Sequence, residues 1–155
     1  MKKCILLIVT FVLLVGLCGC EKKDKVIASL PDYNGKLFYT SGGFQDYTDY
    51  AKYLYENVTV QTFTSSKYFR ETNLDDVDEM LLNIGNFEDW VDTIGGQLED
   101  KYDFDKSIVT EGDYFYIKTK EGEEISQSPY GKFDNYTVYF FDMDTQILYY
   151  FHNNI

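Results

Sequence analysis

The C-terminal stretch YTVYFFDMDTQILYYFH (residues 136–152) decides the fold that this sequence predicts. Its outer parts, 136–141 and 147–152, are rich in aromatic and β-branched residues, which favour β-strands. Between them, Asp142 and Asp144 favour a turn, because aspartate side chains accept hydrogen bonds from nearby backbone N–H groups. The stretch therefore predicts a β-hairpin near the C-terminus.

Two further elements are indicated upstream of this hairpin. The segment DYFYIKTK (113–120) has strand-forming composition and is bounded by a Glu-Gly pair on each side. Earlier, after the turn residues 40–43, apolar residues recur at spacings of three and four from Phe44 to Leu54, which is the period of one helical face. We therefore expect a strand at 113–120 and a helix over about 43–57.

A second helix is indicated between these two elements. Thr72 or Asn73 can cap it, and apolar residues follow at helical spacing up to Ile94, with an interruption at Gly85-Asn86. Residues 58–63 alternate β-branched and polar side chains and predict a short strand or an extended link. Together these segments predict an α+β fold, with N-terminal helices packed on a C-terminal antiparallel sheet of three or four strands.

The N-terminal sequence is typical of a targeting signal. Lys2 and Lys3 precede an apolar run from Ile5 to Cys18. This run has the length of a signal-peptide core and is shorter than the roughly 20 residues that span a membrane. It closes in the tetrapeptide LCGC (17–20).

This tetrapeptide resembles the lipobox of bacterial lipoproteins, with Leu17 at the apolar position, Gly19 before the cleavage site and Cys20 as the invariant thiol. The resemblance implies that Cys20 carries a diacylglyceryl group and becomes the first residue of a protein held on the extracytoplasmic face of the cell membrane. An uncleaved N-terminal span with an incidental cysteine is the alternative. The expected organisation is a signal peptide, 1–19, a lipidated cysteine with a flexible tether, 20–35, and a single extracellular α+β domain, 36–155.

The rest of the chain is similar to small surface lipoproteins of anaerobic Gram-positive bacteria. The likeness is carried by three segments, Phe44-Gln45-Asp46-Tyr47, Asp113-Tyr114-Phe115-Tyr116 and Tyr149-Tyr150-Phe151-His152-Asn153-Asn154-Ile155. It implies the same address and the same domain boundary, and it brings no activity with it.

Cysteine content and charge exclude several functions for the mature protein. The resemblance implies that its remaining thiol, that of Cys20, is alkylated, so disulfides, thiolate zinc sites and cysteine nucleophiles are not expected. After the loss of Lys2 and Lys3 it holds twelve of the 14 basic residues and all 26 acidic ones, a net charge of −14. Such a protein is repelled by nucleic acid. We expect the membrane as a partner, through the lipid, and no nucleic acid.

His152 is the only histidine and would have to serve any serine–histidine pair. None of the serines lies in a Gly-x-Ser-x-Gly turn, and the place of His152 at a strand end favours a hydrogen bond to a backbone carbonyl. The candidate serines are Ser29, Ser41, Ser65, Ser66, Ser107, Ser126 and Ser128. We therefore expect no catalytic residue.

Asp142-Met143-Asp144 resembles the opening of a calcium loop, but Ile147 and Asn153 stand where that loop needs glycine and glutamate. A hairpin turn in which the aspartates bond their own backbone explains the segment better. The His-Glu-x-x-His pattern of catalytic zinc sites does not occur in the sequence. We expect neither a metal site nor another cofactor.

Tyrosine is abundant, with 15 residues, and its apolar ring with a polar hydroxyl suits both half-buried strands and binding surfaces. We expect a non-enzymatic binding or interaction module whose partner is a protein, a peptide or a glycan. The alternatives are a small hydrolase that uses paired carboxylates on cell-wall or glycan material, and an accessory subunit of a transport or secretion system. The candidate binding residues are Tyr114, Tyr116, Tyr139, Tyr149 and Tyr150, unless these rings pack beneath helices or loops.

Replacing Cys20 by serine should leave an unlipidated precursor, because serine offers no thiol for the thioether bond. Metabolic labelling with an alkyne fatty acid measures the modification, and Cys20→Ser should not be labelled. Cys18→Ser keeps the modified thiol and is the matched control, which should label like the wild type. Equal labelling of Cys20→Ser and the wild type would contradict the lipid anchor.

Overall fold

The computed structural model describes residues 24–43, 46–94, 98–119 and 135–154. The leader and Cys20 lie outside these residues. The chain divides into two compact units, Met1–Leu30 and Pro31–Ile155. In the first unit, Asp24 precedes the 3₁₀ turn η1 (Ile27–Ser29), and its carboxylate accepts a hydrogen bond from Val26 N at 2.8 Å.

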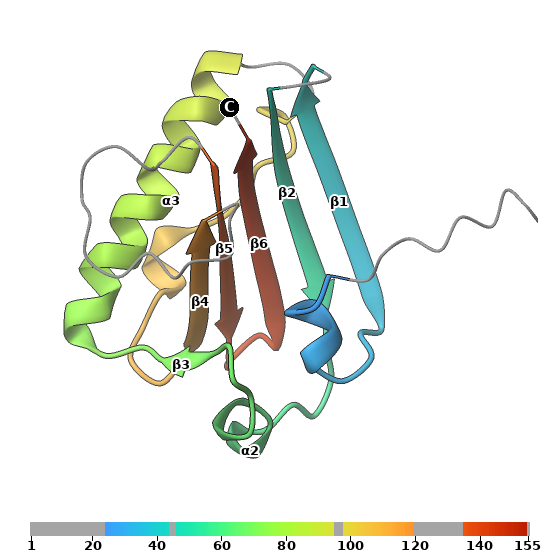
Figure 1. Ribbon diagram of the computed structural model, residues 1–155, viewed down its shortest axis with the longest axis vertical. Helices are drawn as coiled ribbons and strands as arrows, with labels where there is room; N and C mark the ends of the chain where they lie inside the picture. Colours follow the sequence, from blue (N-terminus) through green and yellow to red (C-terminus); the bar gives the residue numbers. More distant parts are fainter. Residues whose placement is uncertain (1–23, 44–45, 95–97, 120–134, 155) are drawn as a thin grey trace, which may run out of the picture. The chain divides into compact units, whose positions relative to one another are not determined.

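The second unit is built on a six-stranded antiparallel sheet with the strand order β1-β2-β6-β5-β4-β3 (Figure 1). The strands are β1 (Gly35–Gly42), β2 (Tyr47–Leu54), β3 (Arg70–Glu71), β4 (Tyr114–Thr119), β5 (Asn135–Asp142) and β6 (Ile147–Asn154). The helices are α2 (Val60–Thr64), α3 (Leu74–Ile94) and the 3₁₀ turn η2 (Lys106–Ile108). The described part of the chain thus combines helix and sheet. None of its helices has the length and apolarity needed to cross a bilayer.

The predicted C-terminal hairpin is confirmed, and it supplies two central strands of the sheet. β5 and β6 pair along all eight residues of each strand. Asp142 closes the turn between them, because its Oδ1 accepts from Asp144 N at 2.9 Å and its Oδ2 accepts from Thr145 Oγ1 at 2.6 Å. The aspartate therefore bonds its own turn, as the sequence predicts for this segment. The strand expected at 113–120 is present as β4, with Lys120 outside the described residues.

α3 begins where the sequence predicts a helix cap. Asn73 Oδ1 accepts hydrogen bonds from Asp75 N and Asp76 N at 3.0 and 3.1 Å, and Asp76 Oδ2 accepts from Asn73 N at 3.3 Å. These bonds satisfy backbone N–H groups that the first turn of a helix leaves free. The predicted interruption at Gly85-Asn86 is wrong, because the helix continues through both residues to Ile94.

The predicted arrangement of N-terminal helices on a C-terminal sheet of three or four strands is wrong. The segment 43–57, expected as a helix, instead contains β2, which pairs with β1 on one side and β6 on the other. Because β2 buries side chains on both faces, including the consecutive residues Tyr50 and Ala51, its apolar residues do not alternate, and their spacing matches a helix by coincidence. The strand or link expected at 58–63 is also wrong, since α2 begins within it.

α3 packs its apolar stripe on one face of the sheet. Met80, Ile84, Phe87 and Val91 are buried at the helical period, and they join side chains from β2, β4, β5 and β6 in one core. The ring of Phe87 lies edge-on to that of Phe151, with 5.3 Å between the ring centres. Aromatic packing of this kind holds the helix on the sheet.

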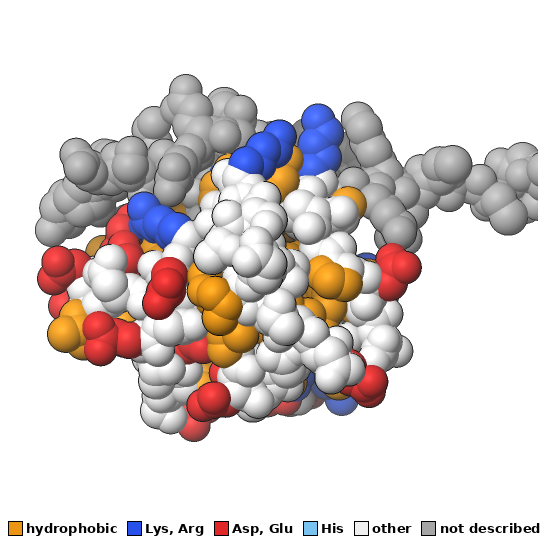
Figure 2. All heavy atoms as spheres, turned by 90° about the horizontal axis from the view of Figure 1, so that it is seen from below, with side chains coloured by type: hydrophobic (Ala, Val, Ile, Leu, Met, Phe, Trp, Pro, Cys, Tyr) orange, Lys and Arg blue, Asp and Glu red, His pale blue; other side chains and the backbone are white. Residues whose placement is uncertain are grey.

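Acidic side chains are spread over the face of the molecule shown in Figure 2. They alternate there with polar and hydrophobic groups and do not gather in a single patch. Charge distributed in this way keeps copies of a protein apart.

Truncation of Phe87 to alanine should lower the free energy of unfolding by about 3–5 kcal/mol, because it leaves a cavity between α3 and β6. Leu82→Ala is the matched control on the same helix. Leu82 is 53% exposed, so its truncation should change the free energy of unfolding by less than about 0.5 kcal/mol. Urea unfolding followed by circular dichroism measures both variants. Equal losses would contradict the packing of α3 on the sheet.

Candidate functional site at the edge of the sheet

The two edges of the sheet differ in how well they are protected against pairing with a further strand. At one edge, β3 has two residues, both charged, and the Arg70 guanidinium lies 3.6 Å from Asp76 and 3.4 Å from Glu79 of α3. At the other edge, β1 has eight residues and, within the described residues, pairs with β2 alone. Short charged edges resist the addition of further strands, whereas a long edge accepts them. β3 pairs with the first two residues of β4. Of the two edge strands, β1 is the longer and the less protected, and it forms the open edge of this sheet.

The register shows which backbone groups of β1 face away from the sheet. Gly43 N donates to Asp46 O at 2.7 Å, one step beyond the Gly42–Tyr47 pair. Hydrogen-bonded pairs alternate along an antiparallel ladder, so the odd-numbered residues of β1 bond to β2. The N–H and C=O groups of the even-numbered residues from 36 to 40 therefore point outward, where an added strand could pair with them.

Hydrophobic side chains are exposed along this edge. Leu37 and Phe38 are 43% and 46% exposed, and Leu54, which pairs with the start of β1, is 39% exposed. β1 contains no proline, and its one charged side chain, Lys36, lies back over the sheet. Its Nζ is 4.9 Å from the ring centre of Phe38 and 5.3 Å from that of Tyr53. β1 thus lacks the prolines and outward charges that usually guard an edge strand.

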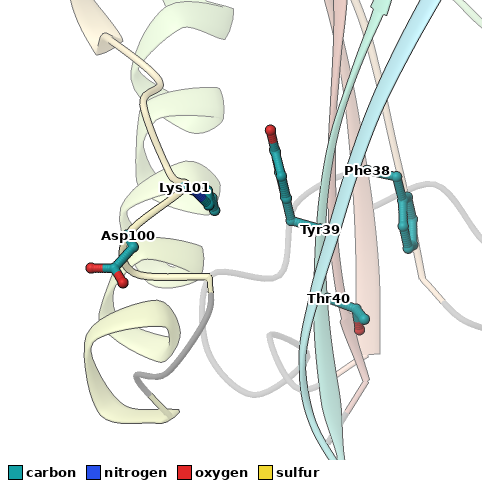
Figure 3. A pocket seen from close by; sticks show the side chains of 5 residues that line it. All are labelled: Phe38, Tyr39, Thr40, Asp100 and Lys101. Atoms are coloured by element: carbon teal, nitrogen blue, oxygen red, sulfur yellow. The ribbon is translucent and has the colours of Figure 1, made fainter.

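A pocket of about 410 Å³ lies beside the same strand (Figure 3). Phe38, Tyr39 and Thr40 line it from β1, and Asp100 and Lys101 line it from the other side. Because consecutive strand residues point to opposite faces, a pocket that touches all three lies along the open edge. Its volume is within the range of ligand-binding clefts.

The wall opposite β1 is a turn that the core holds in place. Lys101 N and Tyr102 N both donate to Leu98 O, at 2.9 and 2.8 Å, and Leu98 is fully buried. The ring of Tyr102 packs on that of Tyr50, with 5.0 Å between the ring centres. The turn is therefore positioned by two side chains inserted in the core.

The two charged side chains of this turn point in different directions. Figure 3 shows the Asp100 carboxylate directed away from β1 and Lys101 on the side that faces Tyr39. Lys101 and Tyr39 thus line opposite walls of the pocket, one with an ammonium group and the other with a phenol.

A row of polar residues crosses the sheet beside the open edge. Thr40, Asp49, His152 and Thr137 stand opposite one another on β1, β2, β6 and β5. Burial raises the pKa of Asp49, and the hydrogen bond with Thr40 and the charges of His152 and Lys36 oppose this rise. Asp49 is therefore a buried acid whose charged form is stabilised by its neighbours.

His152 makes the kind of contact that its position at a strand end predicts. Its Nδ1 lies 3.0 Å from Tyr136 O and 3.0 Å from Thr137 Oγ1. A carbonyl oxygen only accepts hydrogen bonds, so Nδ1 carries the hydrogen in its contact with Tyr136. Among the described residues, Thr137 supplies a hydroxyl that contacts His152. Ser126 and Ser128 lie outside the described residues.

Two buried acids, Asp113 and Asp142, stand one step beyond the Tyr114–Phe141 pair of β4 and β5. Asp113 Oδ2 accepts from Thr110 N at 2.9 Å, and its Oδ1 accepts from Met143 N at 3.0 Å. Burial raises the pKa of Asp113, and these hydrogen bonds oppose the rise. Both acids are thus bonded to turns of the fold. In the part of the chain that the structure describes, His, Cys, Asp and Glu side chains form no group of three or more that could hold a metal ion.

The five candidate tyrosines do not share one surface. Tyr149 is buried in the core that α3 covers, and the alternation of strand residues places the other four on the opposite face. On that face Tyr139 and Tyr114 are buried, and Tyr116 and Tyr150 are half-buried. The ring centre of Tyr139 lies 6.0 Å from that of Tyr116 and 5.4 Å from that of Tyr150. Ligand binding by these residues stays a prediction.

The sequence predicts neither the edge strand nor a role for Lys101. The segment GKLFYTSG (35–42) places strand-forming residues between glycines, which is a strand signal. Its last residues also suit a turn, and that interpretation obscured the strand. No sequence pattern marks Lys101, which reaches the pocket only because the turn after α3 folds back toward β1.

None of the protein-family models, curated proteins or solved structures with which the chain was compared matches it. Its function is therefore inferred from its own residues and their geometry.

Asp49 should contribute to stability in a pH-dependent way. Because burial raises its pKa, the folded chain keeps this proton above about pH 4, where the unfolded chain loses it. Its contribution to the free energy of unfolding therefore falls as the pH rises from about 4 through the raised pKa. Asp49→Asn has no charge to bury, so its stability relative to the wild type should rise over this range. Urea unfolding at several pH values measures the difference.

Asp105→Asn is the matched control, and its stability relative to the wild type should fall as the pH rises toward about 4. Asp105 is exposed, and hydrogen bonds from Ser107 lower its pKa. Its contribution to stability is therefore present above about pH 4 and lost as the pH falls. If the curves of the wild type and Asp49→Asn stay parallel, the folded chain does not bury the Asp49 charge.

Proposed function

We propose that this chain is a non-enzymatic binding module that takes up an extended polypeptide segment as an added strand beside β1. The observation that carries the proposal is the open edge, which is eight residues long, apolar at Leu37 and Phe38, and flanked by a pocket. Strand addition to an exposed edge is a general mode of peptide recognition. Main-chain hydrogen bonds supply the affinity, and side-chain pockets supply the specificity.

The backbone groups and exposed side chains of β1 determine how tightly an added strand would bind. Lys36, Phe38 and Thr40 each offer one outward donor and one outward acceptor, and each bond contributes about 0.5–1.5 kcal/mol net. Burial of the exposed parts of Leu37 and Phe38 adds about 25 cal/mol per Å² of apolar surface. The ordering of a flexible peptide opposes both contributions. We therefore expect a dissociation constant on the order of micromolar, which suits reversible capture.

We propose that this module lies outside the cytoplasm, anchored by a lipid on Cys20. The lipobox-like tetrapeptide at 17–20 supports this placement. An anchored module there meets secreted and surface polypeptides, including subunits of transport or secretion systems. The role of an accessory subunit is thus one setting in which strand addition would operate.

The geometry does not favour the hydrolase alternative. Glycoside hydrolysis needs two carboxyl groups that are free to transfer a proton and to act on the sugar or on a water. Asp113 and Asp142, the buried acids that face each other, accept hydrogen bonds from turns of the fold. His152 is bonded in the same way to Tyr136 O.

Proline at position 38 should block strand addition, because it removes an outward N–H group and no bond of the β1–β2 ladder. Phe38→Ala is the matched control, since it removes the same ring and keeps the N–H group. A phage-displayed library of random peptides of about 12 residues is selected on the full chain in lipid nanodiscs. The selected peptides should bind Phe38→Pro at least about tenfold more weakly than Phe38→Ala, which corresponds to one lost hydrogen bond.

Thermal unfolding controls for damage to the fold. If the two variants melt within a few degrees of each other, the difference in binding comes from the outward N–H group. Equal binding by Phe38→Pro and Phe38→Ala would refute strand addition at β1, and so would the failure to enrich any peptide on the wild type.

A further inference from the structure

We infer that the pocket beside β1 recognises a carboxylate on the bound strand, either of an acidic side chain or of a free C-terminus. The inference rests on the proposed strand addition and names the ligand feature that the pocket selects. Two residues that line the pocket on opposite walls and carry hydrogen-bond donors support it.

Lys101 is the first donor. It is exposed and lines the pocket, and among the described residues its ammonium group forms no ion pair. Two other lysines on this side of the sheet differ in this respect, because Lys52 binds Asp103 and Lys106 binds Glu88. Lys101 is therefore a cation without a partner in the described part of the chain.

Tyr39 is the second donor. Its ring is half-buried against the core, and its hydroxyl forms no hydrogen bond within the described residues. Nearby phenols of the same core do form such bonds, since Tyr50 donates to Asp103 and Tyr102 donates to Glu88, each at 2.9 Å. The packing fixes the Tyr39 ring and leaves its hydroxyl available to a ligand.

Strand addition would bring a ligand side chain to these two donors. The ligand residue opposite Tyr39 sends its side chain to the same face, with the two Cβ atoms about 4.5–5.5 Å apart. A carboxylate only accepts hydrogen bonds, whereas ammonium and phenol groups both donate them. Bonds of this charge-assisted kind are stronger than those between neutral groups. A basic side chain at the same position would be repelled by Lys101.

The net charge of the chain limits the preference for an acidic residue to one position of the bound strand. The mature part carries a net charge of −14 and repels a strongly acidic polypeptide at long range. The ligand should therefore carry one acidic group opposite Tyr39 and neutral or basic residues elsewhere.

Charge reversal at Lys101 tests the inference. The peptides selected on the wild type should share Asp or Glu at one fixed position, and selection on Lys101→Glu should replace these residues by Lys or Arg. Tyr39→Phe, which removes only the hydroxyl, should weaken binding of the most enriched peptide about threefold. Lys67→Glu, in the connection to β3, is the matched charge reversal and should change binding less than about twofold.

Synthetic versions of the most enriched peptide identify the source of the carboxylate. A loss of about tenfold or more on Glu→Gln assigns the contact to the side chain, and an equal loss on C-terminal amidation assigns it to the chain end. Peptides that discriminate against Phe38→Pro yet depend on neither a carboxylate nor Lys101 would overturn this inference and leave strand addition intact. Peptides that bind Phe38→Pro and Phe38→Ala alike would overturn strand addition itself.

Discussion

The double pairing of β6 holds the sheet together. This last strand pairs over eight residues with β2 on one side and with β5 on the other. Buried Asn153 accepts a hydrogen bond from Thr48 Oγ1 at 2.9 Å, between residues 105 positions apart in the chain. Without β6, β1 and β2 would be an isolated hairpin, which is marginally stable in water. Contacts of such long sequence separation also slow folding, because the chain must close a large loop before they form.

The sequence predicts the parts of the fold that neighbouring residues determine. The turn at Asp142 and the cap at Asn73 each depend on residues within three positions. The identity of β2 depends instead on β6, a distant partner that a local pattern does not reveal. The same holds for the candidate site. The sequence shows that tyrosine is abundant, but it does not show that Tyr139 is buried, because distant parts of the chain cover it. The strand-forming residues of β1 could have been recognised, but their exposure follows from the strand order of the sheet.

The core determines the geometry of the candidate site as well as its stability. Tyr50 is the register partner of Tyr39 on β1, and its ring packs on Tyr102 in the turn that carries Lys101. Both walls of the pocket are therefore attached to one fully buried ring. A site built in this way is formed before a ligand arrives, so little of the binding free energy is lost in ordering the protein.

The unequal edges of the sheet also limit self-association. Two copies that met through β1 would form a closed pair with two-fold symmetry, and β3 would form both outer edges of the joined sheet. β3 has two charged residues and pairs with the first two residues of β4, and such a short, charged strand is a poor template for another copy. Fibrils need two adhesive sides on every unit, so one open edge per sheet favours closed pairs of molecules over fibrils.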